Sequence, residues 1–303
     1  MFDRWKSLIG NIALLVATIT ATALQLPAQD AAYLASINAE RAEENKNLKA
    51  PDGWLSLVAL EWIQPGDLTV GSSPGSHLQL PHGVANAFTL RSANGKVQLS
   101  AANPSLTLQS HPAKVGQLIE VNENTAAGLR WDTFTANLIK REDRLYLRIR
   151  DSSSPVLQHF HSPRFYPINP NFRFTAHYTP YSTPHTLTMA TQTGQILKLP
   201  SPGYVEFKAE GTTIRLEPFE AEDGSLAFIF RDSTSRTKTY GSGRELTAKV
   251  PSNGLKTTGD VILDFNEATN PACAYTPFGT CPIPPPANRL TIALPAGEQR
   301  YHE

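Results

Sequence analysis

Two arginines in the C-terminal third of the chain have the residue type and surroundings of an anion-binding site. Arg231 and Arg244 enclose a stretch rich in serine and threonine that ends with Gly241 and Gly243. A guanidinium group binds a carboxylate or phosphate through two parallel hydrogen bonds, and glycine lets a ligand approach the backbone closely. We therefore predict that these arginines hold the charged group of a small polar or anionic ligand.

A second polar group lies in residues 264–289, which contain both cysteines of the chain and six prolines. Proline fixes the backbone, so this segment should follow a defined, irregular path of the kind that often carries functional side chains. Asp264 could orient an arginine or exchange a proton. If the protein hydrolyses its ligand, we predict Asp264 and Glu206 as the two carboxyl groups, because acid–base catalysis needs a pair with unequal pKa values. The predicted ligand site comprises Arg231, Asp232, Tyr240, Arg244, Asp264, Asn266, Asn270 and Asn288.

The same residues have two other interpretations. Arg231 could pair internally with Asp232 or Asp264, and the protein would then be a non-catalytic module of the cell envelope that engages a protein partner through its surface. The oxygen-bearing side chains at 264–270 also suggest a calcium-binding loop. Ala268, however, occupies a position where the usual calcium loop has an acid or amide. We predict no metal and no cofactor.

Export from the cytoplasm is predicted by the N-terminus. Arg4 and Lys6 precede an apolar run at 8–24, and small residues follow it, which is the pattern of a signal peptide at 1–28. An uncleaved membrane anchor is the alternative, and it would be the only contact with a membrane. A periplasmic or secreted location is oxidising, so Cys273 and Cys281 are predicted to form a disulfide, with two free thiols as the alternative.

The charge of the chain is balanced, with 27 lysines and arginines against 27 aspartates and glutamates. Because no basic excess is present, nucleic acid is excluded as a partner.

The pattern of apolar residues predicts the elements that would carry the site. Residues 29–49 have helical spacing, whereas the rest of the chain alternates with a period of two and is divided by turns. Asn94-Gly95 and Gly211 occupy the turns of two predicted hairpins. We therefore predict an all-β antiparallel sandwich, either one large or two packed sandwiches, preceded by one surface helix. Residues 29–303 form one family domain, or divide into 53–151 and 171–303.

Several short motifs are spread along the chain, at 52–57, 203–207, 230–234, 240–244, 264–266, 270–273 and 281–290. The most specific of them are an Asn-Pro-x-Cys sequence and a Cys-Pro-x-Pro-Pro-Pro sequence. In their order and spacing these motifs resemble one known bacterial family, domain-of-unknown-function family 1684, from about Asp30 to the C-terminus. Ala272 replaces a second proline that is often found there. The resemblance implies no activity.

Overall fold

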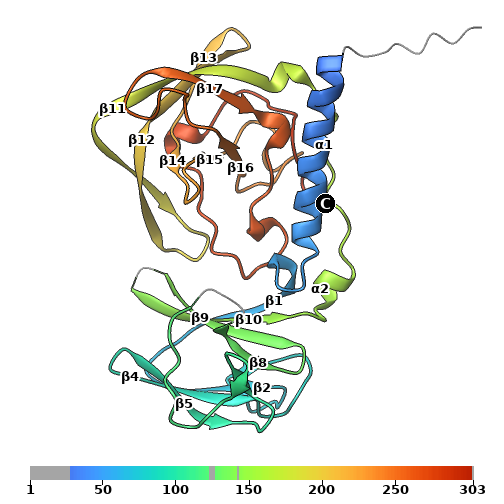
Figure 1. Ribbon diagram of the computed structural model, residues 1–303, viewed down its shortest axis with the longest axis vertical. Helices are drawn as coiled ribbons and strands as arrows, with labels where there is room; N and C mark the ends of the chain where they lie inside the picture. Colours follow the sequence, from blue (N-terminus) through green and yellow to red (C-terminus); the bar gives the residue numbers. More distant parts are fainter. Residues whose placement is uncertain (1–27, 123–126, 142, 302–303) are drawn as a thin grey trace, which may run out of the picture.

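The computed structural model describes residues 28–122, 127–141 and 143–301. The predicted signal peptide lies outside these residues, apart from Ala28. Figure 1 shows two β-rich lobes, with one long helix lying along the side of the C-terminal lobe. Within the described residues, no helix is long and apolar enough to cross a membrane.

The predicted N-terminal helix is α1 (Ala28–Leu48). Most of its side chains are exposed, but Ile37 and Leu48 are almost completely buried. The helix is therefore attached to the protein by a narrow apolar stripe, as expected for a surface helix.

The N-terminal lobe contains two sheets packed over one core. The first has the strand order β1-β10-β9-β8-β6-β7 and the second β3-β2-β4-β5. All of their ladders are antiparallel except the short pair β2 and β3. The elements of this lobe are η1 (Trp54–Ser56), β1 (Leu57–Trp62), β2 (Gly66–Gly71), β3 (Leu78–Gln79), β4 (Phe88–Ala93), β5 (Lys96–Ala102), β6 (Thr107–Leu108), β7 (His111–Pro112), β8 (Leu129–Trp131), β9 (Phe134–Arg141) and β10 (Arg144–Asp151).

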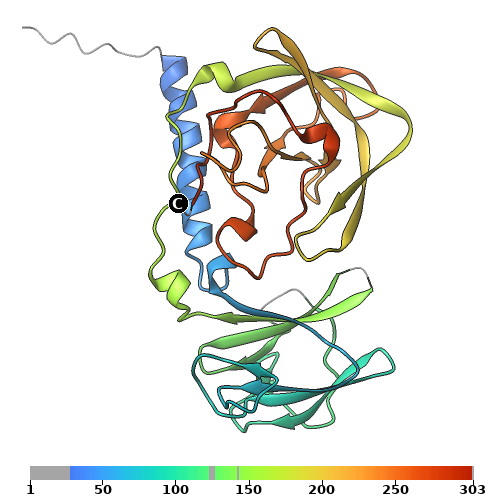
Figure 2. The same ribbon diagram turned by 180° about the vertical axis from the view of Figure 1, so that it is seen from behind.

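The C-terminal lobe combines a four-stranded sheet, β13-β12-β11-β17, with a three-stranded sheet, β14-β15-β16. Figure 2 shows from behind how these strands curve around a common interior. The elements of this lobe and its approach are α2 (Pro155–Gln158), η3 (Pro170–Phe172), β11 (Arg173–Ala190), β12 (Ile196–Ala209), β13 (Thr212–Leu216), β14 (Phe219–Glu220), β15 (Leu226–Phe230), β16 (Arg244–Ala248), β17 (Gly259–Asp264), η4 (Phe265–Glu267), η5 (Ala272–Ala274) and η6 (Pro286–Asn288).

Both predicted hairpins are present. Asn94 and Gly95 join β4 to β5 with φ angles of 52° and 71°, and Glu210 and Gly211 join β12 to β13 with φ angles of 50° and 75°. Positive φ at both central residues defines the tight turn that matches the twist of two paired strands.

Each lobe has its own hydrophobic core. One core comes from residues 59–149 and the other from residues 176–296. A third, smaller cluster joins Leu48 at the end of α1 to Leu55 and Tyr275. The architecture is therefore all-β and antiparallel with one N-terminal helix, as predicted.

Candidate functional site

A groove of about 700 Å³ lies on the outer face of the C-terminal lobe. It forms where β16 and β17, the edge strands of the two sheets, run next to one another. Along β16 the side chains alternate, so Leu246 points into the core while Glu245 and Thr247 face outward. The residues lining the groove are Glu40, Arg173, Asp223, Ser225, Glu245, Thr247, Ala248, Lys249, Val250, Asp260, Ile262, Asp264, Glu267 and Thr269.

One wall of the groove is built by α1 and η4, which contact each other. Glu40 comes from the helix and Glu267 from the short 3-10 turn that follows β17. Asp264 caps that turn by accepting a hydrogen bond from the Asn266 N–H at 3.0 Å. The cap holds Glu267 at the groove because a 3-10 turn leaves its first N–H groups unpaired unless a side chain accepts them.

Glu40 and Glu267 interact directly as two acidic groups. Burial raises the pKa of Glu267 to about 7, and the charges of Glu40 and Asp264 raise it further. Partial burial and the charge of Asp264 also raise the pKa of Glu40, while a hydrogen bond from Glu267 opposes that rise. Near neutral pH, Glu267 therefore retains a proton for part of the time.

Asp264 serves mainly to attach α1 to the sheet. The hydroxyl of Tyr33 donates a 2.8 Å hydrogen bond to Asp264 Oδ2, and Arg173 Nε lies 3.5 Å from the same oxygen. Burial and the bond to Asp264 raise the pKa of Tyr33, so its hydroxyl remains a donor. Asn266 donates to Tyr33 Oη at 3.0 Å and to Asp264 Oδ1 at 2.9 Å. Asp264 and Asn266 are thus close together, as predicted, in a structural network at the edge of the groove.

The groove is acidic. Six carboxyl groups line it, against the two cationic side chains of Arg173 and Lys249. Such a surface attracts cations and repels anions. The predicted preference for an anionic ligand therefore finds no support in the charge of this groove.

Arg244 does not face a ligand. It is 1% exposed, and its Nη2 donates to Asp232 Oδ2 at 2.7 Å and to Leu294 O at 3.0 Å. Its Nη1 donates to the carbonyl oxygen of Ala296. All of the acceptors of Arg244 are groups of the protein itself. This agrees with the alternative interpretation, in which the predicted site residues form an internal structural network.

The remaining predicted residues lie apart from the groove. Asn288 is buried, accepts from Glu217 N at 2.8 Å and donates to Ile229 O at 3.0 Å. Tyr240 donates to Cys273 O at 2.9 Å. Arg231 is half-buried at the end of β15 and forms a backbone bridge with Arg289. These contacts stabilise the irregular C-terminal segment.

Asn270 contacts a buried carboxyl group that the sequence analysis did not find. Glu298 is fully buried, and its two carboxyl oxygens accept hydrogen bonds from Asn270 N and Nδ2, both at 2.8 Å, and from the hydroxyl of Tyr275. Burial raises the pKa of Glu298 to about 7. Its neighbours Ala296 and Gly297 are also buried. In the sequence, the burial of Glu298 was indicated only by the short apolar stretch that precedes it.

The predicted pair of carboxyl groups is not formed. On β11, Asp264 is opposite Arg173 and Glu206 is opposite His177, so the two acids lie on opposite sides of that strand and four positions apart along it. Ladder spacings place their backbones roughly 15 Å apart. Glu267 and Glu40 form the close pair instead. Among the described residues, no group of three or more His, Cys, Asp or Glu side chains could hold a metal ion.

The predicted disulfide is not formed either, and both cysteines are free thiols. The two residues are close to one another. Cys273 N donates to Cys281 Sγ at 3.2 Å, and Cys281 N donates to Cys273 Sγ at 3.3 Å. Each sulfur is therefore used as a hydrogen-bond acceptor, and the loop is closed by these two bonds.

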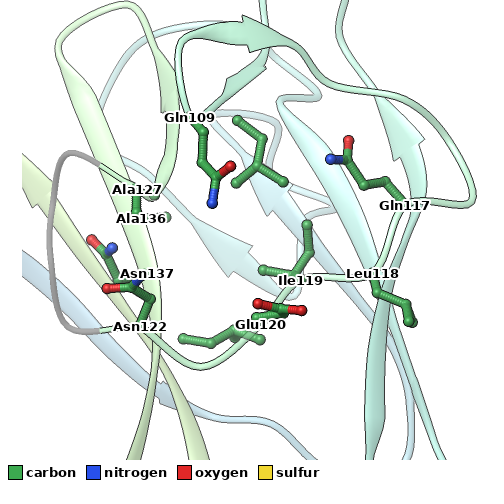
Figure 3. A pocket seen from close by; sticks show the side chains of 12 residues that line it. Gln109, Gln117, Leu118, Ile119, Glu120, Asn122, Ala127, Ala136 and Asn137 are labelled. Carbon is green, nitrogen blue, oxygen red and sulfur yellow. The ribbon is translucent and has the colours of Figure 1, made fainter.

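A smaller cavity of about 210 Å³ lies in the N-terminal lobe (Figure 3). Gln109 and Ile119 point into it, while Leu118 points away. Glu120 is the one carboxyl group among its described lining residues. Because this cavity lacks two interacting ionisable groups, the groove of the C-terminal lobe is the better candidate site.

Fold and site together define an all-β, two-lobed protein with an acidic groove beside its helix. Residues 158–299 match the family described as "Protein of unknown function (DUF1684)". The match covers most of the C-terminal lobe. It begins later than the predicted start near Asp30.

No curated protein matches the chain. An uncharacterized protein of Haloarcula marismortui, solved by NMR in solution, is 28% identical, and the match covers 47% of this chain and 78% of that chain with a TM-score of 0.40.

Proposed function

We propose that the protein binds a small polar molecule, cationic or uncharged, in the groove between β16, β17 and α1. The observation that carries this proposal is the coincidence of a cavity of about 700 Å³ with the interacting pair Glu40 and Glu267. Pockets with convergent polar groups and a perturbed pKa are the usual sites of ligand binding. The groove is also much larger than the other cavities described, which measure 210 to 340 Å³.

Titration calorimetry with three probes of similar size tests which charge the ligand carries. Ethylammonium, ethanol and acetate should bind in that order of affinity, because six carboxyl groups line the groove. The variant Glu245→Gln should weaken ethylammonium binding, whereas Glu61→Gln, in the N-terminal lobe, should leave it unchanged. Acetate binding more tightly than ethylammonium would contradict the proposal.

A second proposal is that the site hydrolyses its ligand. Glu267, in its protonated form, would donate a proton to the leaving group, and the Glu40 carboxylate would remove a proton from the attacking water. The pKa of about 7 for Glu267 supports this assignment, since a general acid works best when its pKa is near the working pH. With a cleavable substrate, Glu267→Gln should lower kcat at least a hundredfold and remove the basic limb of the pH–rate profile. An unaltered profile would show that Glu267 is not the acid.

One set of residues fits the alternative proposal, in which the protein is a non-catalytic module of the cell envelope. The Arg244–Asp232 pair and Asn288 are buried and bonded within the protein, so they act as structural groups. If none of the three probes binds to the groove, the non-catalytic alternative is preferred. Under both proposals we expect the protein to be exported to the periplasm or the medium. Fractionation of cells that express the full chain would test this location.

A further inference from the structure

An apolar cavity of about 300 Å³ adjoins the acidic groove. Glu245 and Thr247 of β16 line both spaces, so the cavity begins on the other side of these two side chains. The remaining lining residues are apolar, in contrast with the groove. They are Leu197, Leu199, Phe219, Ala227, Phe228, Ile229, Leu246 and Pro282.

The cavity is built on the outer face of the three-stranded sheet. Phe228 of β15 is fully buried in the core of the lobe, whereas its neighbours Ala227 and Ile229 belong to the opposite face. The first half of β12 provides Leu197 and Leu199 on another side, and both are only half-buried. Apolar side chains are thus gathered around an open space outside the core, which is a common feature of ligand-binding sites.

We propose that this cavity binds the apolar part of an organic cation whose ammonium group lies in the acidic groove. The proposal rests on the proposed function and specifies its ligand: an amine or ammonium compound with an alkyl or aryl substituent. Charge complementarity selects the cationic end, because carboxyl groups outnumber cationic side chains in the groove that the cavity adjoins at Glu245. The size of the cavity suits the apolar end, since pockets for small molecules begin at about 300 Å³.

If the groove and the apolar cavity bind the two ends of one ligand, the affinity should increase with the length of the ligand's alkyl chain. Burial of one methylene group contributes about 0.8 kcal/mol, which corresponds to about a fourfold gain in affinity. Lengthening the probe from ethylammonium to butylammonium should therefore lower Kd roughly fifteenfold. The neutral and anionic analogues, butanol and butanoate, should bind far more weakly because they lack the charge that the groove attracts.

Titration calorimetry on the full chain tests this proposal with one variant and one matched control. Ala227→Phe fills the cavity from the outer face and should remove the gain with chain length while leaving the Kd of ethylammonium unchanged. Ala101→Phe places the same ring on an exposed strand position of the other lobe and should behave as the wild type. Thermal unfolding of both variants establishes that they are folded.

The outcomes separate this inference from the proposed function. Equal Kd values for ethylammonium and butylammonium in the wild type would overturn the inference and leave cation binding in the groove intact. Butanol binding as tightly as butylammonium would also overturn it, since the cavity would then act alone. Failure of every ammonium probe to bind would overturn both proposals. If Ala227→Phe does not fold, the three wild-type probes with four carbons decide the question by themselves.

Discussion

Glu298 is a carboxyl group placed where a charge is costly. Its pKa rises from an ordinary value of 4.5 to about 7, chiefly because it is fully buried. Between these two pH values the folded protein holds a proton that the unfolded chain has released. The free energy of unfolding should therefore fall as the pH rises from about 4.5 to 7, by about 3 kcal/mol for this group. Glu267, whose pKa is also about 7, acts with the same sign.

Urea unfolding of the wild type and of Glu298→Gln at several pH values measures this effect. The variant cannot ionise, so its stability should vary less between pH 5 and 8 than that of the wild type. Glu267→Gln should remove a separate part of the same pH dependence. If the wild type is most stable above pH 7, Glu298 is not protonated in the folded state.

Gly279 is required for the contact between the two cysteines. A Cβ at this position would press against Cys273 Sγ and would also lie 3.2 Å from Cys273 N and 3.3 Å from Cys281 Sγ. Gly279→Ala should lower the free energy of unfolding by about 1–3 kcal/mol, as overpacking does elsewhere. Gly75→Ala is the control, because a Cβ there meets nothing within 4 Å. Equal stability of the two variants in urea unfolding would contradict the tight packing of this loop.

At the scale of elements, Tyr33 attaches the first half of α1 to the sheet. Tyr33→Phe removes the donor to Asp264 and leaves that buried carboxylate with fewer hydrogen bonds. Hydrogen bonds to charged groups contribute about 1.5–3 kcal/mol, so stability should fall by that amount. Hydrogen exchange should become faster in α1, and Glu40 should lose its position in the groove. Tyr181→Phe is the control, because the hydroxyl of Tyr181 accepts from Arg215 and not from α1, and it should not affect exchange in α1.

The elements themselves were largely predictable from the sequence. Alternation with a period of two and the turn residues Asn94-Gly95 and Gly211 are local signals, and they gave the correct hairpins. The site was less predictable because it depends on contacts between distant segments. Glu40 and Glu267 are 227 positions apart, and only the packing of α1 on η4 brings them together.

The arginines illustrate the same limit. Residue type and nearby glycines suggested that Arg244 binds a ligand, whereas its position on β16 decides its role. Residue 244 points into the core, as do Leu246 and Ala248. A strand residue one position away, such as Glu245, faces the groove. The alternation along one strand therefore separates a structural arginine from an acid that lines the groove.

At the scale of the whole molecule, the separate cores predict that the lobes unfold separately. Leu99 belongs to one core and Leu246 to the other, and each is at most 2% exposed. Replacing either leucine with alanine removes buried methyl groups and leaves a cavity, at a cost of about 2–5 kcal/mol. The small cluster around Leu48, Leu55 and Tyr275 is the main apolar link among the described residues that could transmit this loss.

Hydrogen exchange of the two variants, followed by mass spectrometry, measures how far the loss extends. Leu99→Ala should accelerate exchange in residues 57–151 and leave β11 to β17 unchanged, because the C-terminal core keeps all of its contacts. Leu246→Ala should have the opposite pattern. Equal acceleration in both lobes by either variant would show one cooperative unit, and residues 53–151 and 171–303 would then not be separate domains. The groove and the adjoining apolar cavity should keep their ligand affinity in Leu99→Ala, since both lie in the C-terminal lobe.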